Sequence, residues 1–328
     1  MHPNPTTPPL TIHRDRLQLG GLSIRFVRTL RIPDDGRRYP LPPGLGTFPL
    51  RRVADHADRV PEAMRRAGGV LLPMYRREAL WLSFGHAPHA LKVGVGKVCA
   101  LTGERWREGL ADRPQNYLVT GRQPWLDGIA TGRGTIRQFV AMPLGMGYTV
   151  EGQVSGEEKH GGLQLQAYPP KPGAIPPRPL RRCRAAGGPP APCAPAAAGA
   201  MGLGAGGSMV QKIYRDPHGI GTWDTARRLR VFVHLVDAMR WRELTGEAPP
   251  PTPVTAKAYA EAGLPWFELE DEGAAAIGGS PALADVKSVK EMDEATFGQP
   301  LQDDAPVSPG AVVALPPGAL PVSDGDWQ

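Results

Sequence analysis

Glycine and proline interrupt this chain so often that its regular elements must be short. The 328 residues include 41 glycines and 38 prolines. Between these breaks, apolar residues form brief alternating runs, such as Leu22, Ile24 and Phe26, which are typical of strands with one buried face. Short strands at close spacing predict an antiparallel sandwich or barrel, because a parallel sheet would need long strand–helix–strand units that this pattern lacks.

We therefore expect an α+β, β-rich protein: an antiparallel sandwich- or barrel-like body with two or three helices, a low-complexity loop and a disordered C-terminal tail. Segments rich in Pro, Ala and Gly bury too little apolar surface to offset the entropy of ordering. In chain order we expect a disordered segment at 1–9, a β-rich region at 10–168, a flexible Pro/Ala/Gly/Arg-rich segment at 169–207, a strand plus helices packing on the β-rich region at 208–297, and a disordered tail at 298–328. A GC-rich reading frame translated out of phase gives the same composition, so the sequence leaves open whether 171–200 is a genuine insert.

Local patterns place the individual elements. A helix is predicted at 61–67, between a proline that suits the first turn and a glycine stop, and another at 252–262. Residues 223–246 fit a strand by alternation and a helix by their apolar stripe, and their length favours the helix. Strands are predicted at 78–84, 91–101, 117–119, 135–141, 148–154, 163–168 and 209–214.

The composition excludes several classes of protein. No run of 18 apolar residues predicts a transmembrane helix, and the first thirty residues contain no pattern of a secretory signal. The three cysteines include no C-x-x-C pair, so neither a disulfide framework nor a structural zinc site is expected. We therefore expect a soluble, cytoplasmic protein with no membrane partner.

The charge is unevenly distributed along the chain. The net charge is +6, but residues 1–200 carry 28 Lys and Arg against 14 Asp and Glu, whereas residues 201–328 carry 10 against 18. Arginine is enriched together with Ala, Gly and Pro, as codon bias in a GC-rich genome produces, and no aromatic platform is interleaved with it. Nucleic-acid binding is therefore not favoured, and a contact between the acidic tail and the basic body is expected instead.

Short motifs give little support to any cofactor. The run 202–207, GLGAGG, matches the dinucleotide fingerprint by letter, but it follows a low-complexity segment and precedes a strand-like run rather than a helix. His86 and His89 cannot close a zinc site without further ligands. No G-x-S-x-G elbow is present. We therefore expect no cofactor and no metal.

Two polar clusters are candidate binding sites. Glu151, Glu157, Glu158 and His160 bracket a predicted hairpin, where carboxylates beside a histidine could perform acid–base chemistry or bind a cation. A solvated, charged hairpin is the simpler alternative.

The second cluster combines polar and aromatic side chains on one loop, a composition that suits a pocket wall. The simpler alternative is a loop whose aspartate caps a helix and whose tryptophan packs on the core. Its members are Tyr214, Asp216, His218, Trp223 and Asp224.

Four longer strings resemble an uncharacterised family of bacterial and fungal hypothetical proteins. They are RTLRIPDDG at 28–36, YPLPPGLG at 39–46, RQFVAMPLGMGYTVEGQ at 137–153 and AKAYAEAGLPWFELEDE at 256–272. The resemblance covers most of residues 10–300 apart from 171–200. It implies membership and brings no activity, cofactor or catalytic residue with it.

Three functional hypotheses follow. The first is a non-enzymatic interaction or ligand-binding protein, because no complete catalytic constellation is visible. The second is a carboxylate- or metal-assisted hydrolase, which requires the 151–160 and 214–224 regions to converge on one site. The third is a nucleic-acid binder.

Overall fold

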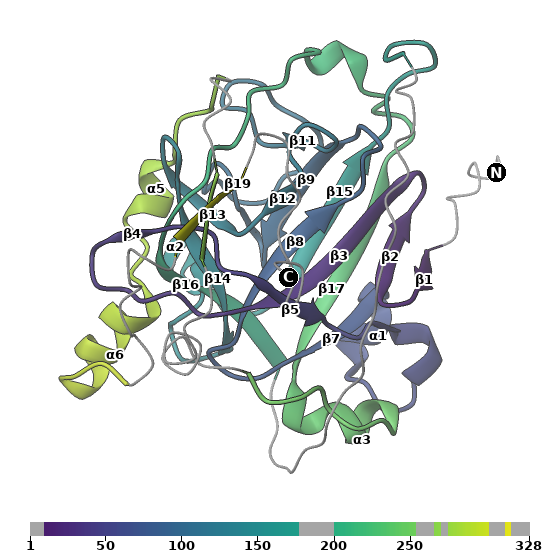
Figure 1. Ribbon diagram of the computed structural model, residues 1–328. Coiled ribbons are helices and arrows are strands. Elements are labelled where there is room, and N and C mark those ends of the chain that lie inside the picture. Colours follow the sequence, from purple (N-terminus) through teal and green to yellow (C-terminus); the bar gives the residue numbers. More distant parts are fainter. Residues whose placement is uncertain (1–9, 177–199, 254–265, 270–274, 302–311, 316–328) are drawn as a thin grey trace.

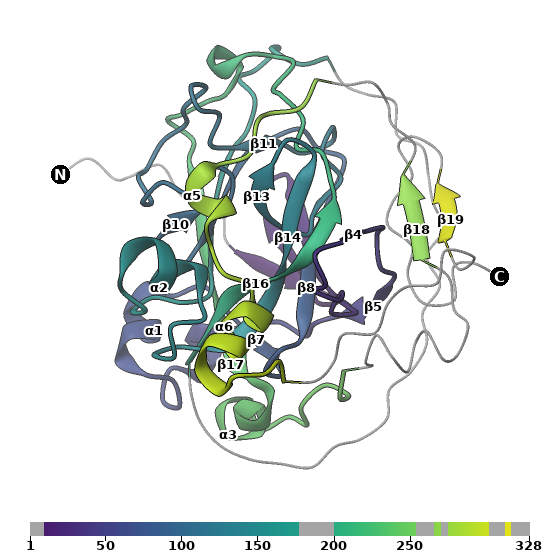
Figure 2. The same cartoon turned by 90° about the vertical axis from the view of Figure 1, so that its left-hand side faces the viewer.

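In the computed structural model, residues 10–176, 200–253, 266–269, 275–301 and 312–315 are described (Figures 1 and 2). The described chain is 40% strand and 16% helix, which confirms the β-rich α+β class. Seventeen strands form one large, mainly antiparallel sheet that does not close on itself, and two further strands pair separately. None of the helices in the described ranges is long and apolar enough to cross a membrane.

Most strands are short, as the glycine and proline spacing predicts. The separate pair is β18 (Trp266–Leu269) with β19 (Val312–Leu315). The strands of the large sheet are β1 (Thr11–His13), β2 (Arg16–Leu19), β3 (Leu22–Thr29), β4 (Arg38–Tyr39), β5 (Gly44–Thr47), β6 (Arg51–Arg52), β7 (Val70–Met74), β8 (Ala79–Phe84), β9 (Ala90–Val95), β10 (Val98–Cys99), β11 (Leu118–Val119), β12 (Trp125–Leu126), β13 (Gly128–Gly132), β14 (Thr135–Pro143), β15 (Leu163–Tyr168), β16 (Ala200–Val210) and β17 (Leu229–Asp237). The strands β3, β14, β16 and β17 are the longer exceptions, with 8, 9, 11 and 9 residues.

The helices lie at the periphery of the sheet (Figure 2). The 3-10 turns are η1 (Val53–His56), η2 (Ile220–Thr222) and η3 (Ala238–Arg240), and the α-helices within the described ranges are α1 (Glu62–Ala67), α2 (Val150–Ser155), α3 (Trp241–Thr245), α5 (Pro281–Ala284) and α6 (Val289–Phe297). The predicted helix at 61–67 is confirmed as α1, which begins after Pro61 and ends at Gly68, a residue with φ of 65°. A small apolar cluster around Trp241 and Leu71 packs beside α3.

One antiparallel path runs through the sheet in the order β1–β2–β3–β8–β14–β16–β17–β15–β9. β7 lies parallel to β17, pairing Val233 with Val70. The alternating residues of these strands point into one continuous apolar core. Leu22, Ile24 and Phe26 of β3 are fully buried there, in the same cluster as Leu229 of β17.

The helix predicted over 223–246 is wrong for its central part. Residues 229–237 form β17, a strand with β15, β16 and β7 as neighbours. Its alternate residues Leu229, Val231 and Val233 are buried, so the period of two, rather than the apolar stripe, describes the segment. Pairing with strands distant in sequence decides this choice, and such pairing leaves no local signal.

The strand predicted over 148–154 is also wrong, because residues 150–155 form α2. The hydroxyl of Thr149 accepts a hydrogen bond from the Gly152 N–H at 3.0 Å, which is an N-cap. Gly156 ends the helix with φ of 76°. The local start and stop signals therefore override the apolar alternation.

Part of the segment predicted to be flexible is a central strand. Residues 200–207 belong to β16, which pairs with β14 along most of its length. Its glycines permit close approach: a Cβ at Gly204 would lie 2.8 Å from the Tyr148 carbonyl oxygen, and one at Gly207 would lie 2.1 Å from the Pro33 oxygen. The GLGAGG run is therefore a strand packed against backbone, which contradicts any dinucleotide-binding role. Residues 169–176 are also described, and Pro170 bridges to Trp223.

The strand predicted over 209–214 is confirmed only for its first two residues, because β16 ends at Val210. Other sequence-based expectations lie outside the described residues. They are the disordered segment at 1–9, most of the flexible segment at 177–199, all but the first two residues of the helix at 252–262, and the contact of the acidic tail with the basic body. In the predicted tail, four residues are described as β19.

Asp127 gives the fold a specific pH dependence. This carboxyl group is 1% exposed between β12 and β13, and it accepts a hydrogen bond from Gln211 Nε2 at 3.0 Å. Burial without a cationic partner among the described residues raises its pKa to about 8. Because the folded pKa lies above the unfolded value, this group stabilises the fold most at low pH, and that contribution is lost as pH rises through about 8.

We predict that Asp127→Asn gains stability relative to the wild type as pH rises, by up to about 1.4 kcal/mol per unit, because asparagine keeps the acceptor without titrating. The measurement is urea unfolding of both proteins between about pH 5 and pH 8, the range set by the raised pKa. Exposed Asp58→Asn is the control and should run parallel to the wild type. Parallel curves for all three proteins would show that Asp127 is ionised in the fold.

Candidate functional site

Glu151, in the first predicted cluster, is a buried carboxylate that accepts hydrogen bonds from the backbone of two neighbouring loops. The residue is 2% exposed at the start of α2. Its Oε1 accepts a hydrogen bond from the Lys97 backbone N–H at 3.1 Å, and its Oε2 accepts from the backbone N–H groups of His160 and Gly161 at 3.2 and 2.8 Å. The His160 Nδ1 lies 3.6 Å from Oε1. The carboxylate thus ties α2 to the β9–β10 turn and to the loop before β15.

The neighbouring acids have equally local roles. Glu158 accepts hydrogen bonds from the Thr149 hydroxyl at 2.6 Å and from the Gly147 N–H at 3.0 Å. Burial alone would raise the pKa of Glu158, but these hydrogen bonds outweigh it and lower that pKa. Glu157 is exposed and pairs with Lys159 at 3.2 Å. The hydrogen bonds of this cluster organise the α2 region.

Asp216 anchors the second predicted cluster. Its Oδ2 accepts hydrogen bonds from the Tyr117 hydroxyl at 2.6 Å and from Trp223 Nε1 at 2.9 Å, and its Oδ1 accepts from the His218 N–H at 2.8 Å. Burial and the bond to Asp216 both raise the pKa of Tyr117. The His218 ring meets the edge of the buried Trp223 ring at 5.9 Å. These contacts hold the loop of residues 214–224 against Tyr117, which directly precedes β11.

The two remaining candidates also serve the loop. The Tyr214 backbone N–H donates to Gln123 Oε1 at 3.0 Å, and the Arg122 guanidinium lies 5.5 Å from the Tyr214 ring centre. Asp224 Oδ1 accepts from the N–H groups of Ala226 and Arg227, which forms a turn rather than the predicted helix cap.

The structure does not bring the two clusters together. Glu151 bonds at the Lys97 end of β9, whereas Trp223 packs with Ala90 and Tyr168 at the other end. The β9–β15 ladder runs from the pair Val95–Leu163 to the pair Ala90–Tyr168. Five strand steps of about 3.3 Å separate these ends by about 17 Å. A single hydrolytic site built from both clusters does not fit this distance.

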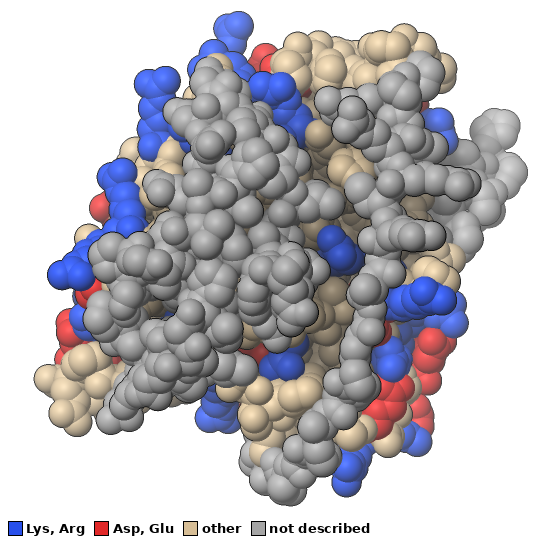
Figure 3. Space-filling view, in the orientation of Figure 1, with Lys and Arg blue, Asp and Glu red and all other residues tan. Residues whose placement is uncertain are grey.

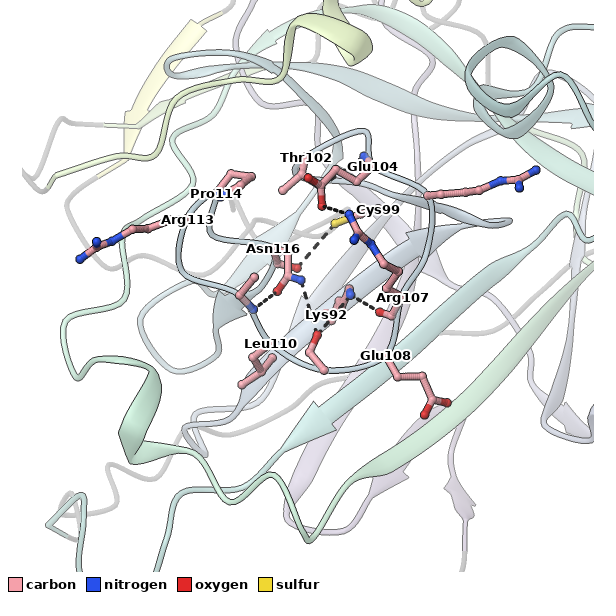
Figure 4. Close-up of a pocket in the computed structure, with 13 residues that line it drawn as sticks. Lys92, Cys99, Thr102, Glu104, Arg107, Glu108, Leu110, Arg113, Pro114 and Asn116 are labelled. Atoms are coloured by element: carbon pink, nitrogen blue, oxygen red, sulfur yellow. Dashed lines mark hydrogen bonds and ion pairs between the residues drawn. The ribbon is translucent and has the colours of Figure 1, made fainter.

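A different region encloses a cavity of about 320 Å³ (Figure 4). Its floor comes from β9 and β10, and its cover is the loop of residues 102–116, which we call the cover loop. Asn116 holds the cover loop in shape, because its Oδ1 accepts from the Ala111 N–H at 2.9 Å. Cys99 Sγ lies 3.6 Å from the Asn116 carbonyl oxygen on the same wall.

Lys92 is the most unusual residue of this cavity. It is 2% exposed, and its ammonium lies 4.7 Å from the centre of the Trp106 ring. Nζ donates hydrogen bonds to the carbonyl oxygens of Arg107 and of Gly109, the latter at 3.2 Å. No carboxylate among the described residues forms an ion pair with it. Burial lowers the pKa of Lys92, although Cys99 and Glu104 act in the opposite direction.

The neighbours of Lys92 form a polar strip on the same face of the sheet. Gln166 of β15 lies directly opposite Lys92, and it is fully buried. Neither of its side-chain amide atoms has a hydrogen-bond partner in the described parts of the chain. Tyr168, two residues further along β15, accepts a hydrogen bond from the Gly109 N–H at 3.1 Å. Buried polar groups without partners are rare and often mark the place of a ligand or an ordered water.

Charged residues surround the mouth of the cavity. Arg105 and Arg113 are exposed on the cover loop and have no ion-pair partner among the described residues, and Arg113 extends outward in Figure 4. Two acidic residues of the loop are paired, Glu104 with Arg107 and Glu108 with arginines of the β17 region, whereas exposed Asp112 forms no ion pair in the described chain but does not line the cavity. Among the residues that line the cavity, the charged side chains without an ion pair are therefore positive.

Sequence reasoning missed this site because its residues are scattered through ordinary patterns. Lys92 alternates with apolar residues as any half-buried strand residue does, and Cys99 resembles a small apolar strand residue. One usable signal is Gly94, because a Cβ there would lie 2.6 Å from Trp106, the ring that packs against Lys92. The pairing of β9 with β15, which brings Gln166 beside Lys92, is not visible in the sequence.

A second, more open hollow of about 460 Å³ lies between α2 and the α5–α6 segment, and its one lysine, Lys287, is exposed rather than buried. The described part of the chain contains no group of three or more His, Cys, Asp or Glu side chains placed to hold a metal ion. On the face shown in Figure 3, the visible described basic side chains form separate groups, at the margin and near the middle. A track for a nucleic-acid backbone requires contiguous cationic groups.

Comparisons with known proteins assign no function. No family model matches the sequence, and neither a curated protein nor a solved structure matches it significantly.

We predict that Glu151→Ala lowers the free energy of unfolding by about 3 kcal/mol, because three partly buried backbone N–H groups lose their acceptor. Glu157→Ala is the matched control, and it should leave the stability unchanged because its ion pair is exposed. Chemical denaturation of the three proteins measures both effects. Equal stabilities would contradict the fastening role of Glu151.

Proposed function

We propose that the protein binds a small organic anion in the cavity under the cover loop and acts as a cytoplasmic ligand-binding protein. The observation that carries this proposal is Lys92, a buried basic side chain with which no carboxylate forms an ion pair among the described residues. Buried charges in proteins are normally paired, because removing them from water is unfavourable. A bound anion would supply the missing charge.

The size and lining of the cavity support a small ligand. A volume of about 320 Å³ lies at the lower end of the range for small-molecule pockets. The exposed arginines 105 and 113 add a positive potential at the mouth, which raises the rate at which anions approach.

The two alternative functions receive less support. A hydrolase at the predicted acidic clusters needs groups that lie at opposite ends of the β9–β15 ladder. A nucleic-acid binder needs a continuous basic surface, and the basic groups visible in Figure 3 are dispersed.

We predict that small carboxylates and phosphate raise the melting temperature of the protein saturably, and that Lys92→Met weakens their binding by about 10- to 100-fold. This loss corresponds to one buried, charge-assisted hydrogen bond. Isothermal titration calorimetry with acetate, malonate, citrate and phosphate measures the affinities. Exposed Lys171→Met is the matched control and should bind as the wild type does.

A second variant guards against misfolding of Lys92→Met. In Arg105→Gln/Arg113→Gln both substitutions are on exposed side chains, so the fold is expected to persist. Binding should weaken a few-fold, and its dependence on salt should become shallower. Absence of binding to every anion, or unchanged binding by both variants, would overturn the proposed function.

A further inference from the structure

The hydrogen bonds of Lys92 match a neutral amine as well as an ammonium ion. Nζ has two protein acceptors, the carbonyl oxygens of Arg107 and Gly109 (Figure 4). A neutral amine has two N–H groups, which these two acceptors use, and one lone pair, which remains available. No described carboxylate forms an ion pair with Nζ, and the more distant Glu104 and Glu108 only partly offset the lowering of the Lys92 pKa by burial.

The surroundings of Lys92 favour reactivity of that lone pair. The side chain is almost fully buried between β9 and the cover loop, and it borders the cavity. Burial lowers the pKa of Lys92, which enlarges the fraction of nucleophilic amine at neutral pH. Trp106, seated against Gly94, provides an aromatic face that stabilises a cation at the same position.

We infer that the anion bound in this cavity carries a carbonyl group, as a 2-oxo acid does, and that Lys92 captures it as a reversible imine. This inference rests on the proposed function, in which Arg105 and Arg113 at the mouth attract the anionic group of the ligand while the Lys92 amine remains free to react. The inference adds to the proposed function that the ligand also contains a carbonyl group, with which the Lys92 amine reacts.

The reaction balances without any further reagent. The Nζ lone pair attacks the carbonyl carbon and forms the C–N bond, while a proton moves from nitrogen to the carbonyl oxygen. The resulting hydroxyl group leaves as water after taking up a second proton, and the C=N bond forms. In its protonated form the imine carries one positive charge and one N–H, so it keeps one of the two backbone hydrogen bonds and its place beside the Trp106 ring. Nothing is oxidised or reduced.

Two neighbouring side chains suit positioning roles for this step. Gln166 lies opposite Lys92 without lining the cavity, so its unpartnered amide can act on this step only through Lys92. Tyr168 on the same strand face accepts the Gly109 N–H through its hydroxyl oxygen, and burial raises its pKa. The hydroxyl therefore keeps a proton that it can donate.

The decisive experiment is reductive trapping on the full chain. The protein is incubated with pyruvate and sodium cyanoborohydride near neutral pH, and the modified lysines are located by peptide mass spectrometry. We expect Lys92 to react about tenfold faster, for each unit by which its pKa is lowered, than exposed lysines 159 and 171 in the same chain. Because the lysines compete within one molecule, this comparison needs no variant.

Two variants separate the imine from simple anion binding. Lys92→Arg keeps a cation but cannot form an imine, so it should retain affinity for acetate and lose the trapped product. Gln166→Leu should slow trapping while leaving the reaction of Lys171 unchanged.

Each outcome then identifies which proposal fails. Trapping at Lys171 as fast as at Lys92, or no trapping at Lys92, overturns the imine. If acetate binding persists in that case, the proposed anion site survives alone. If neither pyruvate nor acetate binds, both proposals fail.

Discussion

The fold depends on the position of β17, which unites three groups of strands. It pairs with β15 through its first half, with β16 near its end, and with β7 in parallel along residues 233–237. Through β16 it leads to the β14–β8–β3 half of the sheet, and through β15 it leads to β9 and the cavity floor. Its alternating Leu and Val residues enter the shared core. β17 therefore supports the cavity floor through β15, in addition to the pairing of β9 with β10 and β11.

A second constraint is the use of buried glutamines in place of strand pairing. Beyond the end of β16, Gln123 accepts from the Tyr214 N–H and donates to the Lys212 carbonyl oxygen, and Gln115 bonds the next residues in the same way. Each side-chain amide satisfies a backbone donor and a backbone acceptor, as a neighbouring strand would. Gln166 is the exception, because its amide has no partner in the described chain. The side chain beside Lys92 thus differs from Gln115 and Gln123, whose amides stabilise the fold by bonding to the backbone.

Sequence reasoning recovered the features that depend on local chemistry. The β-rich class follows from short alternating runs, and α1 follows from Pro61 and Gly68. It failed where distant residues decide the outcome. The segment 229–237 is a strand because three other strands pair with it. The strand β16 requires glycines because the backbones of Tyr148 and Pro33 leave no room for a Cβ atom. The predicted site residues were polar groups that fasten loops, whereas the cavity depends on the β9–β15 register, which no local pattern shows.

The energetics of Lys92 argue that the cavity is more than a packing defect. A lysine in mid-strand between buried residues is unfavourable for folding alone, and a Leu or Met of similar length would bury the same surface without desolvating a charge. The chain nevertheless supplies three features around it: a glycine that admits Trp106, two carbonyl oxygens aimed at Nζ, and a cover loop shaped by Asn116. Together they hold an amine in one orientation at the wall of a cavity, and orientation of a reactive group is what a binding or covalent function requires.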